Sequence, residues 1–137
     1  MARLVVVCLL AVVIVCLFAG CVTAIPATSK MLEASPAVSY EDAWLAVVDA
    51  VGERLQIEMI DKDSGYLRTG WKEWTRFLTT YRTRCTARVT NRQPFKVKVT
   101  VEKQEYNGMT EQWVPKGNYT ELENEILSDI GGRLQRR

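Results

Sequence analysis

Residues 81–101, YRTRCTARVTNRQPFKVKVTV, decide the fold class of this 137-residue chain. In the first half, small or apolar side chains alternate with Arg82, Arg84 and Arg88. In the second half, Phe95 and three valines alternate with lysine and threonine. An apolar residue at every second position is typical of a strand that buries one face and leaves the other in water. Because turn-forming residues separate the two runs, we expect an antiparallel hairpin with its arginines on the wet face.

A second hairpin is expected earlier in the chain. Residues 56–61 and 66–71 are short runs in which apolar and polar positions alternate, and the DKDSG segment that joins them favours a turn. Gly65 permits a tight reversal there, while the acids and the serine satisfy the backbone N–H groups of the turn. In the second run, the alternation places three residues on one face: Leu67, Thr69 and Trp71.

Two amphipathic helices are predicted on either side of these strands. Ser39 is a good N-cap for the first, and apolar residues recur at three- and four-residue steps over residues 44–55. The last helix is expected to begin near Asn118 or Thr120, and Thr120 and Glu123 fit a capping box. Its apolar residues then recur every four positions over residues 122–134, so each helix has one face that needs burial.

The sheet's single apolar face can bury both helices. We therefore predict an α+β fold of two layers, with an antiparallel sheet of about four strands packed against an N-terminal and a C-terminal helix. Residues 109–116, around Trp113, are expected to add only a short edge segment. The domain is expected to span residues 37–137, which is long enough to form a core without a disulfide.

The beginning of the chain has a different composition. Arg3 is followed by sixteen residues without a charge or a polar amide, and then by small residues. This pattern is typical of an export signal, so we expect a signal peptide in residues 1–20 and a flexible tether in residues 21–36. With the residues that follow it, the apolar run approaches the length that spans a bilayer. A single-span membrane protein with an uncleaved signal anchor is therefore an alternative.

Phe18, Ala19, Gly20 and Cys21 resemble the lipobox of bacterial lipoproteins. The resemblance implies cleavage between Gly20 and Cys21 and acylation of Cys21, so that the chain is attached to a membrane through lipid. Several acyl chains anchor a protein far more firmly than one. By the family's sorting pattern, Val22 implies the outer membrane of a Gram-negative envelope, with the domain facing the periplasm.

A second resemblance lies in the folded part, over residues 39–135. The residues that carry it are Tyr40-x-x-Ala43-Trp44, Ile57 and Asp61-x-Asp63-Ser64-Gly65-Tyr66-Leu67-x-Thr69. Followed by paired strands and a closing helix, they resemble the helix-grip domains of bacterial envelope lipoproteins. They are similar to the domains of the lipoprotein C component of the outer-membrane β-barrel assembly machinery. The resemblance implies a helix-grip fold and an accessory role beside other envelope proteins.

The composition bears on several function classes. The chain has no histidine, the commonest general base and metal ligand, and no CxxC pair. We expect no enzymatic activity, no cofactor and no metal. Without residues 1–20, bases exceed acids by one, which gives no case for nucleic-acid binding. Cys85, on the predicted inward face, is expected to be a small buried apolar residue.

Two surfaces are candidates for contact with a partner protein of the envelope. One is the connection before the central hairpin, whose apolar area exceeds what a loop needs: Trp71, Trp74, Phe77 and Leu78. The other is the wet face of the hairpin, where cations would meet an acidic partner: Arg82, Arg84, Arg88, Lys96 and Lys98. The chain is thus expected to be an accessory or scaffold lipoprotein of the outer membrane.

A periplasmic carrier of lipid or another small apolar ligand is the other alternative. A sheet that curls around a helix can hold such a ligand in its groove. The inward face favours this function less, because Tyr81, Phe95 and the valines fill the space that a ligand would need.

Overall fold

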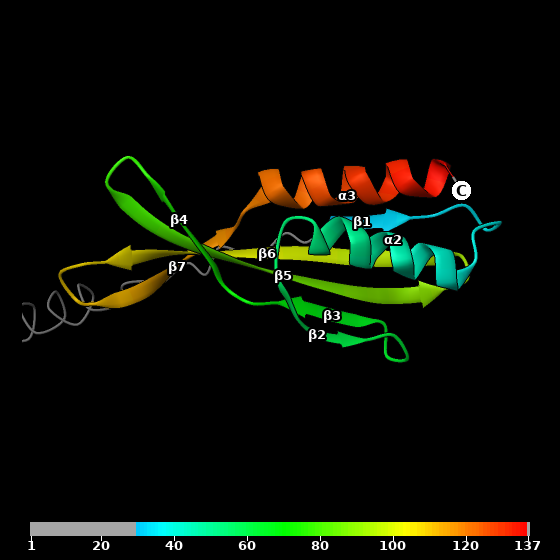
Figure 1. The fold of residues 1–137 in the computed structure, drawn as a ribbon, viewed down its shortest axis with the longest axis horizontal. Helices are drawn as coiled ribbons and strands as arrows, with labels where there is room; N and C mark the ends of the chain where they lie inside the picture. Colours follow the sequence, from blue (N-terminus) through cyan, green and yellow to red (C-terminus); the bar gives the residue numbers. More distant parts are fainter. Residues whose placement is uncertain (1–29, 137) are drawn as a thin grey trace, which may run out of the picture.

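A computed structural model describes residues 30–136 of the chain. Over this range the protein has two helices and a seven-stranded antiparallel sheet (Figure 1). The elements in chain order are β1 (Lys30–Glu33), α2 (Tyr40–Gly52), β2 (Ile57–Asp61), β3 (Tyr66–Thr69), β4 (Lys72–Arg76), β5 (Thr79–Arg92), β6 (Phe95–Asn107), β7 (Gln112–Asn118) and α3 (Thr120–Gln135). The predicted α+β class is confirmed.

The predicted number of strands is wrong, since about four were expected and the described chain has seven. The main sheet has the order β1-β6-β5-β3-β2, with β4 also paired to β5 and β7 to β6. The undercount arises because β5 and β6, at 14 and 13 residues, run well beyond the alternating stretch. Their extra length pairs with β4 and β7, whose aromatic and charged residues lack a clean apolar face.

The expected tether also needs correction, because its last part is in the sheet. Lys30–Glu33 forms β1 and pairs antiparallel with β6, from Lys30 opposite Val99 to Glu33 opposite Lys96. Leu32 packs against the core from this strand. Residues 21–29 of the expected tether, the expected signal peptide and the expected acylation and cleavage residues, Gly20 and Cys21, lie outside the described residues.

Both helices cover the same face of the sheet, and the core lies between them and the central strands (Figure 1). The inward positions predicted for β6 are fully buried: Phe95, Val97, Val99 and Val101. From the helices, Val47 and Ile126 are buried against them. Among the helices of residues 30–136, none has the length and apolar content that crossing a bilayer requires.

The turn predicted at DKDSG is confirmed. One carboxylate oxygen of Asp61 accepts hydrogen bonds from the backbone N–H groups of Asp63 and Ser64, at 3.0 and 3.2 Å. Gly65 has a φ of 67°, and a Cβ at this position would lie only 2.6 Å from the Cβ of Val89. Glycine is therefore required both by the turn and by the neighbouring strand.

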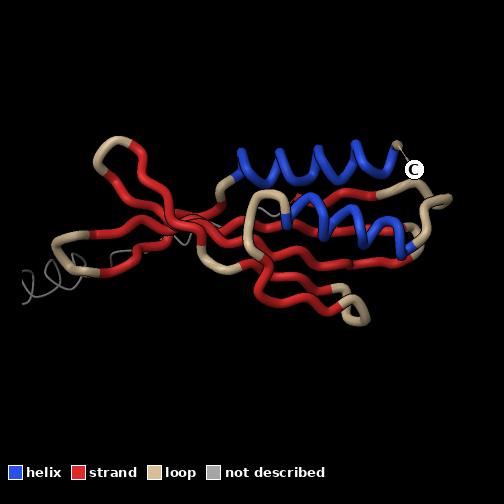
Figure 2. Tube along the Cα trace, viewed as in Figure 1, coloured by secondary structure: helices blue, strands red, loops and turns tan. Residues whose placement is uncertain are grey.

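Two β-hairpins extend beyond the helices at one end of the molecule (Figures 1 and 2). The first arm, residues 72–84, consists of β4 and the start of β5. The second arm, residues 102–118, consists of the end of β6 and β7. Since β5 and β6 continue from the core into both arms, each arm is an extension of the central hairpin.

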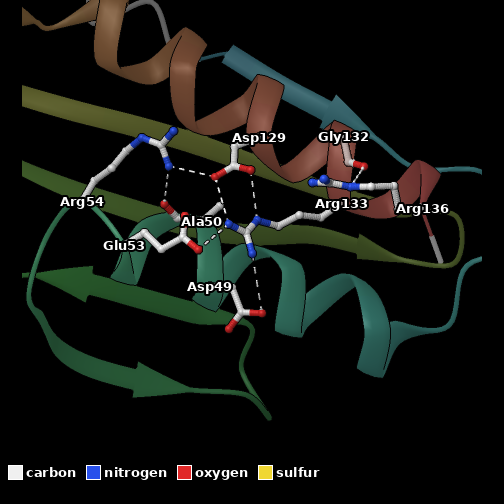
Figure 3. Close-up of polar contacts among 8 residues, drawn as sticks. All are labelled: Asp49, Ala50, Glu53, Arg54, Asp129, Gly132, Arg133 and Arg136. Carbon is white, nitrogen blue, oxygen red and sulfur yellow. Dashed lines mark hydrogen bonds and ion pairs between the residues drawn. The ribbon is translucent and has the colours of Figure 1, made fainter.

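A group of ion pairs joins the end of α2 to α3 (Figure 3). Arg133 donates to Asp129 from Nε at 3.0 Å, and its Nη2 lies 2.7 Å from a carboxylate oxygen of Glu53. Arg54 donates to the other oxygen of Asp129 at 2.8 Å. The hydrogen bonds from the two arginines hold the pKa of Asp129 below its ordinary value. These contacts fix the spacing of the two helices.

Candidate functional site

The residues predicted to meet a partner are divided among three places. Trp71 lies beside Arg82 and Arg84 on the face of the sheet that the helices do not cover, which we call the open face. Trp74 lies on the helix side, stacked on Tyr81 and Tyr119. Phe77 and Leu78 form the tip of the first arm. The apolar group that the sequence suggested is therefore not one surface.

The predicted orientation of Trp71 is wrong, because the indole is on the opposite face from Leu67 and Thr69. Arg68 pairs with Thr86 and Lys72 pairs with Thr83. The three residues 69–71 therefore lie opposite only two residues of β5. One extra residue shifts the alternation by one position, so the side chains that follow lie on the opposite face of the sheet.

On the open face, two tryptophans and two arginines form an alternating stack, which we call the Trp–Arg stack. The guanidinium carbon of Arg82 lies 4.4 Å from the ring centroids of both Trp71 and Trp113. The guanidinium carbon of Arg84 lies 4.5 Å from the ring of Trp71. A guanidinium over an indole face is held by attraction to the π electrons, so the stack connects the two arms across the sheet.

The arginines of the stack also bond to β6. Arg82 donates from Nε to the side-chain oxygen of Gln104 at 2.8 Å, and Arg84 donates from Nη2 to a carboxylate oxygen of Glu102 at 2.8 Å. The expected wet face is thus partly covered at these two positions, because rings and polar side chains enclose the guanidinium groups. The carboxylate of Glu102 offsets the positive charge of Arg84, and a cross-strand pair of opposite charges stabilises a sheet.

Two arginine N–H donors on this face have no hydrogen-bond acceptor among the described residues. The Nε–H groups of Arg84 and Arg68 are buried, and neither has a hydrogen-bond partner within residues 30–136. A buried N–H without an acceptor costs free energy, and most such groups in native structures are paired. Because both atoms are buried, an acceptor on a partner would reach them, and remove that cost, once the side chains that cover them move aside.

The remaining cations of the open face are accessible to solvent. Arg88 and Lys98 lie directly opposite each other on β5 and β6, and both are exposed. Like charges in directly opposite positions destabilise a sheet. Lys96 differs, because its Nζ is 3.0 Å from a carboxylate oxygen of Glu33 on β1. The open face therefore presents a positive area that continues from the Trp–Arg stack.

A second aromatic group fixes the first arm on the helix side. The rings of Trp74 and Tyr81 are 4.7 Å apart, and those of Trp74 and Tyr119 are 5.6 Å apart. Lys103 lies over them, with its Nζ 4.4 Å from the ring of Tyr81. A cavity of about 440 Å³ adjoins this group, and its lining residues are Glu53, Arg54, Leu55, Lys72, Trp74, Thr83, Tyr119, Leu122 and Glu125.

The sequence analysis did not single out Lys103 and Gln104, and it gave Trp113 no role in a site. Trp113, Lys103 and Gln104 contact the predicted arginines or tryptophans from strands that were expected to be shorter. Residues 102–106, EKQEY, carry no apolar alternation that would have indicated a longer strand. Cys85 is buried as expected, and burial, followed by the charge of Glu123, raises the pKa of its thiol to about 12.

The open face therefore combines fixed aromatic rings, accessible cations and two unsatisfied arginine donors. Such a surface suits an acidic partner rather than a bound metal ion, and residues 30–136 contain no group of three potential metal ligands among His, Cys, Asp and Glu. A scan of the sequence against protein-family models finds no match, and a search of curated proteins finds none either.

Proposed function

We propose that this chain is a non-enzymatic accessory lipoprotein that binds an acidic surface of another envelope protein through the open face of its sheet. In this proposal the domain is of the helix-grip type and resembles those of the β-barrel assembly lipoprotein. Acylated Cys21 attaches it to the periplasmic side of the outer membrane. The observation that carries the proposal is the Trp–Arg stack together with the unsatisfied Nε–H groups of Arg84 and Arg68.

The chemistry of the stack supports a protein partner. Tryptophan and arginine are enriched at the centres of protein interfaces, where a few such residues supply most of the binding free energy. Here neighbouring side chains already hold the rings and guanidinium groups, so little conformational entropy is lost on binding. A carboxylate is the natural acceptor for a free arginine N–H. Arg88 and Lys98 extend the positive potential beyond the stack.

The test is site-specific photocrosslinking of the full chain in its own membranes. A photoreactive residue at position 88 should give an adduct with one envelope protein, whereas the same residue at Leu45, an exposed position on α2, should not. The paired variant Arg84→Ala with Lys98→Glu should reduce the adduct several-fold. Arg136→Glu, an exposed change at the end of α3, is the matched control and should leave it unchanged. Equal crosslinking from positions 45 and 88 would refute the proposed face.

Lipid attachment is tested separately. Cys21→Ala should abolish incorporation of labelled fatty acid and release the domain from membranes, because the thiol is the acceptor of lipid in lipoproteins. A variant that stays integral to the membrane and uncleaved would instead support the single-span alternative.

A small-ligand carrier is the second candidate function, favoured by the cavity beside Trp74. Its volume of about 440 Å³ is in the range of ligand pockets. The cavity does not lie within the sheet's apolar face, which the valines and Phe95 fill, and charged residues such as Arg54 and Glu125 line it. Native mass spectrometry of the purified chain should detect a bound molecule if this function holds.

A further inference from the structure

The tips of the two arms carry exposed apolar side chains. Phe77 is 89% exposed and Leu78 is fully exposed at the tip of the first arm, and Met109 is 94% exposed at the tip of the second. Residues 77–81 and 106–110 contain no charged side chain. Each tip is thus an uncharged loop with apolar residues at its outermost point. Charged residues adjoin both loops: Arg76 precedes Phe77, with its guanidinium carbon 5.7 Å from that ring, and Glu111 follows Thr110.

The turn geometry does not explain these residues. Arg76 pairs with Thr79, which leaves Phe77 and Leu78 as a two-residue loop, and Phe77 has a φ of 55°. Loops of this kind favour glycine or asparagine at a position with positive φ, and a bulky residue there is strained. In the second tip, Asn107 makes the turn by accepting hydrogen bonds from the N–H groups of Met109 and Thr110. The side chain of Met109 contributes nothing to that turn.

The described chain begins beside the core part of the sheet, and its first strand starts at the end nearer the arms. β6 runs from the core towards the tip of the second arm, and β1 is antiparallel to it, with Lys30 opposite Val99. Lys30 is therefore at the arm-side end of β1. The proposed lipid anchor, Cys21, precedes this end of β1 by nine positions, and the arms extend past the helices on the side towards which this end of β1 faces (Figure 2).

We infer that the tips of both arms enter the headgroup region of the bilayer to which the N-terminal segment attaches. This inference rests on the proposed membrane attachment, but not on the protein-binding face. A lipid surface fits better than a protein groove, because the apolar residues are points on two separate loops. Tyr81 and Tyr106 lie next to the uncharged loops, and tyrosine is enriched at the level of the headgroups.

The experiment uses the full chain reconstituted into vesicles of phosphatidylethanolamine and phosphatidylglycerol, with no other protein present. A photoreactive amino acid replaces Phe77 in one variant and Met109 in a second. Two matched controls carry it at Leu45 on α2 and Met59 on β2, which are both 46% exposed. After irradiation, mass spectrometry should detect several times more lipid adduct at positions 77 and 109 than at 45 and 59. Equal yields at tips and controls would overturn the inference.

Flotation of the vesicles separates the possible failures. A chain that floats with the vesicles but forms no lipid adduct at either tip disproves the contact while leaving the attachment intact. A chain that does not float disproves both. The irradiation is then repeated in native membranes. A protein adduct in place of lipid at positions 77 and 109 would identify the tips as a protein-binding site and overturn the inference.

Discussion

The buried carboxylate of Glu123 accepts a hydrogen bond from Val101, a residue of β6 that neither β1 nor β7 pairs. Along β6, pairing with β1 extends only as far as Val99, and pairing with β7 starts only at Glu102. Between them, the N–H of Val101 donates to Glu123 at 2.8 Å, and its carbonyl accepts from the N–H of Tyr119 at 2.8 Å. Glu123 was predicted to cap α3 with Thr120. That prediction is wrong, because Tyr119 is the N-cap and Glu123 points into the core instead.

Replacing Glu123 should therefore destabilise the whole domain. Glu123→Leu leaves the buried N–H of Val101 without an acceptor, which costs about 1–3 kcal/mol of unfolding free energy. Glu123→Gln keeps an acceptor oxygen and should cost less. Urea denaturation of the three proteins measures the difference, with the exposed change Glu121→Gln as control. If Glu123→Leu unfolds at the same urea concentration as the parent, the carboxylate has no such role.

Cys85 gives a pH-dependent prediction. The thiol has a pKa of about 12 in the folded protein, chiefly because it is buried, against an ordinary value of 9.0. Above pH 9 the unfolded chain loses this proton while the folded chain keeps it, so stability is complete below pH 9 and falls as the pH rises towards 12. At pH 10 the loss should be about 1 kcal/mol.

Cys85→Ala provides the comparison. Other groups titrate in the same range, so the informative quantity is the difference in unfolding free energy between the parent and the variant at pH 8 and pH 10. That difference should shrink by the predicted amount, because alanine has no proton to lose. A constant difference would show that the thiol ionises equally in both states.

At the scale of elements, the sequence predicts those that bury one face completely. The alternation in β5 and β6 and the apolar stripes of the helices correspond to the buried positions. The arms escape prediction because both of their faces are half-exposed and are held by rings stacked on cations. The orientation of Trp71 depends on one extra residue opposite β5, which no periodicity reveals.

The Trp–Arg stack should hold the arms in place without supporting the core. Trp113 contacts Arg82 and also packs against Tyr106, with ring centroids 5.2 Å apart. Ring and cation contacts of this kind contribute roughly 0.5–1 kcal/mol each. Trp113→Ala should therefore speed amide hydrogen exchange in β7 and β4 by about tenfold, while exchange in α2 and β3 stays unchanged.

Met59→Ala is the control for that measurement, because Met59 is exposed on β2, outside the arms. It should leave the exchange of every arm amide unchanged. Faster exchange throughout the sheet in Trp113→Ala would mean that the arms and the core unfold together.

At the scale of the whole molecule, the sequence predicts a two-layer domain but not its division into a covered core and two uncovered arms. The division has a physical basis, because the helices are shorter than the hairpin they cover. The sheet therefore continues where no apolar layer can reach it, and cation–ring contacts replace core packing there. Partner binding and membrane contact are both proposed for this uncovered part and its margins.

The position of β1 makes the distance to the membrane a testable variable. Because Lys30 is already in the sheet, only residues 22–29 separate it from Cys21, and eight residues span at most about 28 Å. Inserting about twenty Gly and Ser residues there should lower the local concentration of the tips at the bilayer roughly sixfold. Lipid adducts at position 77 should fall accordingly, while fatty-acid labelling of Cys21 stays constant. The same insertion after Arg137 should change neither, and undiminished adducts with the lengthened tether would mean that the tips reach the bilayer without help from the anchor.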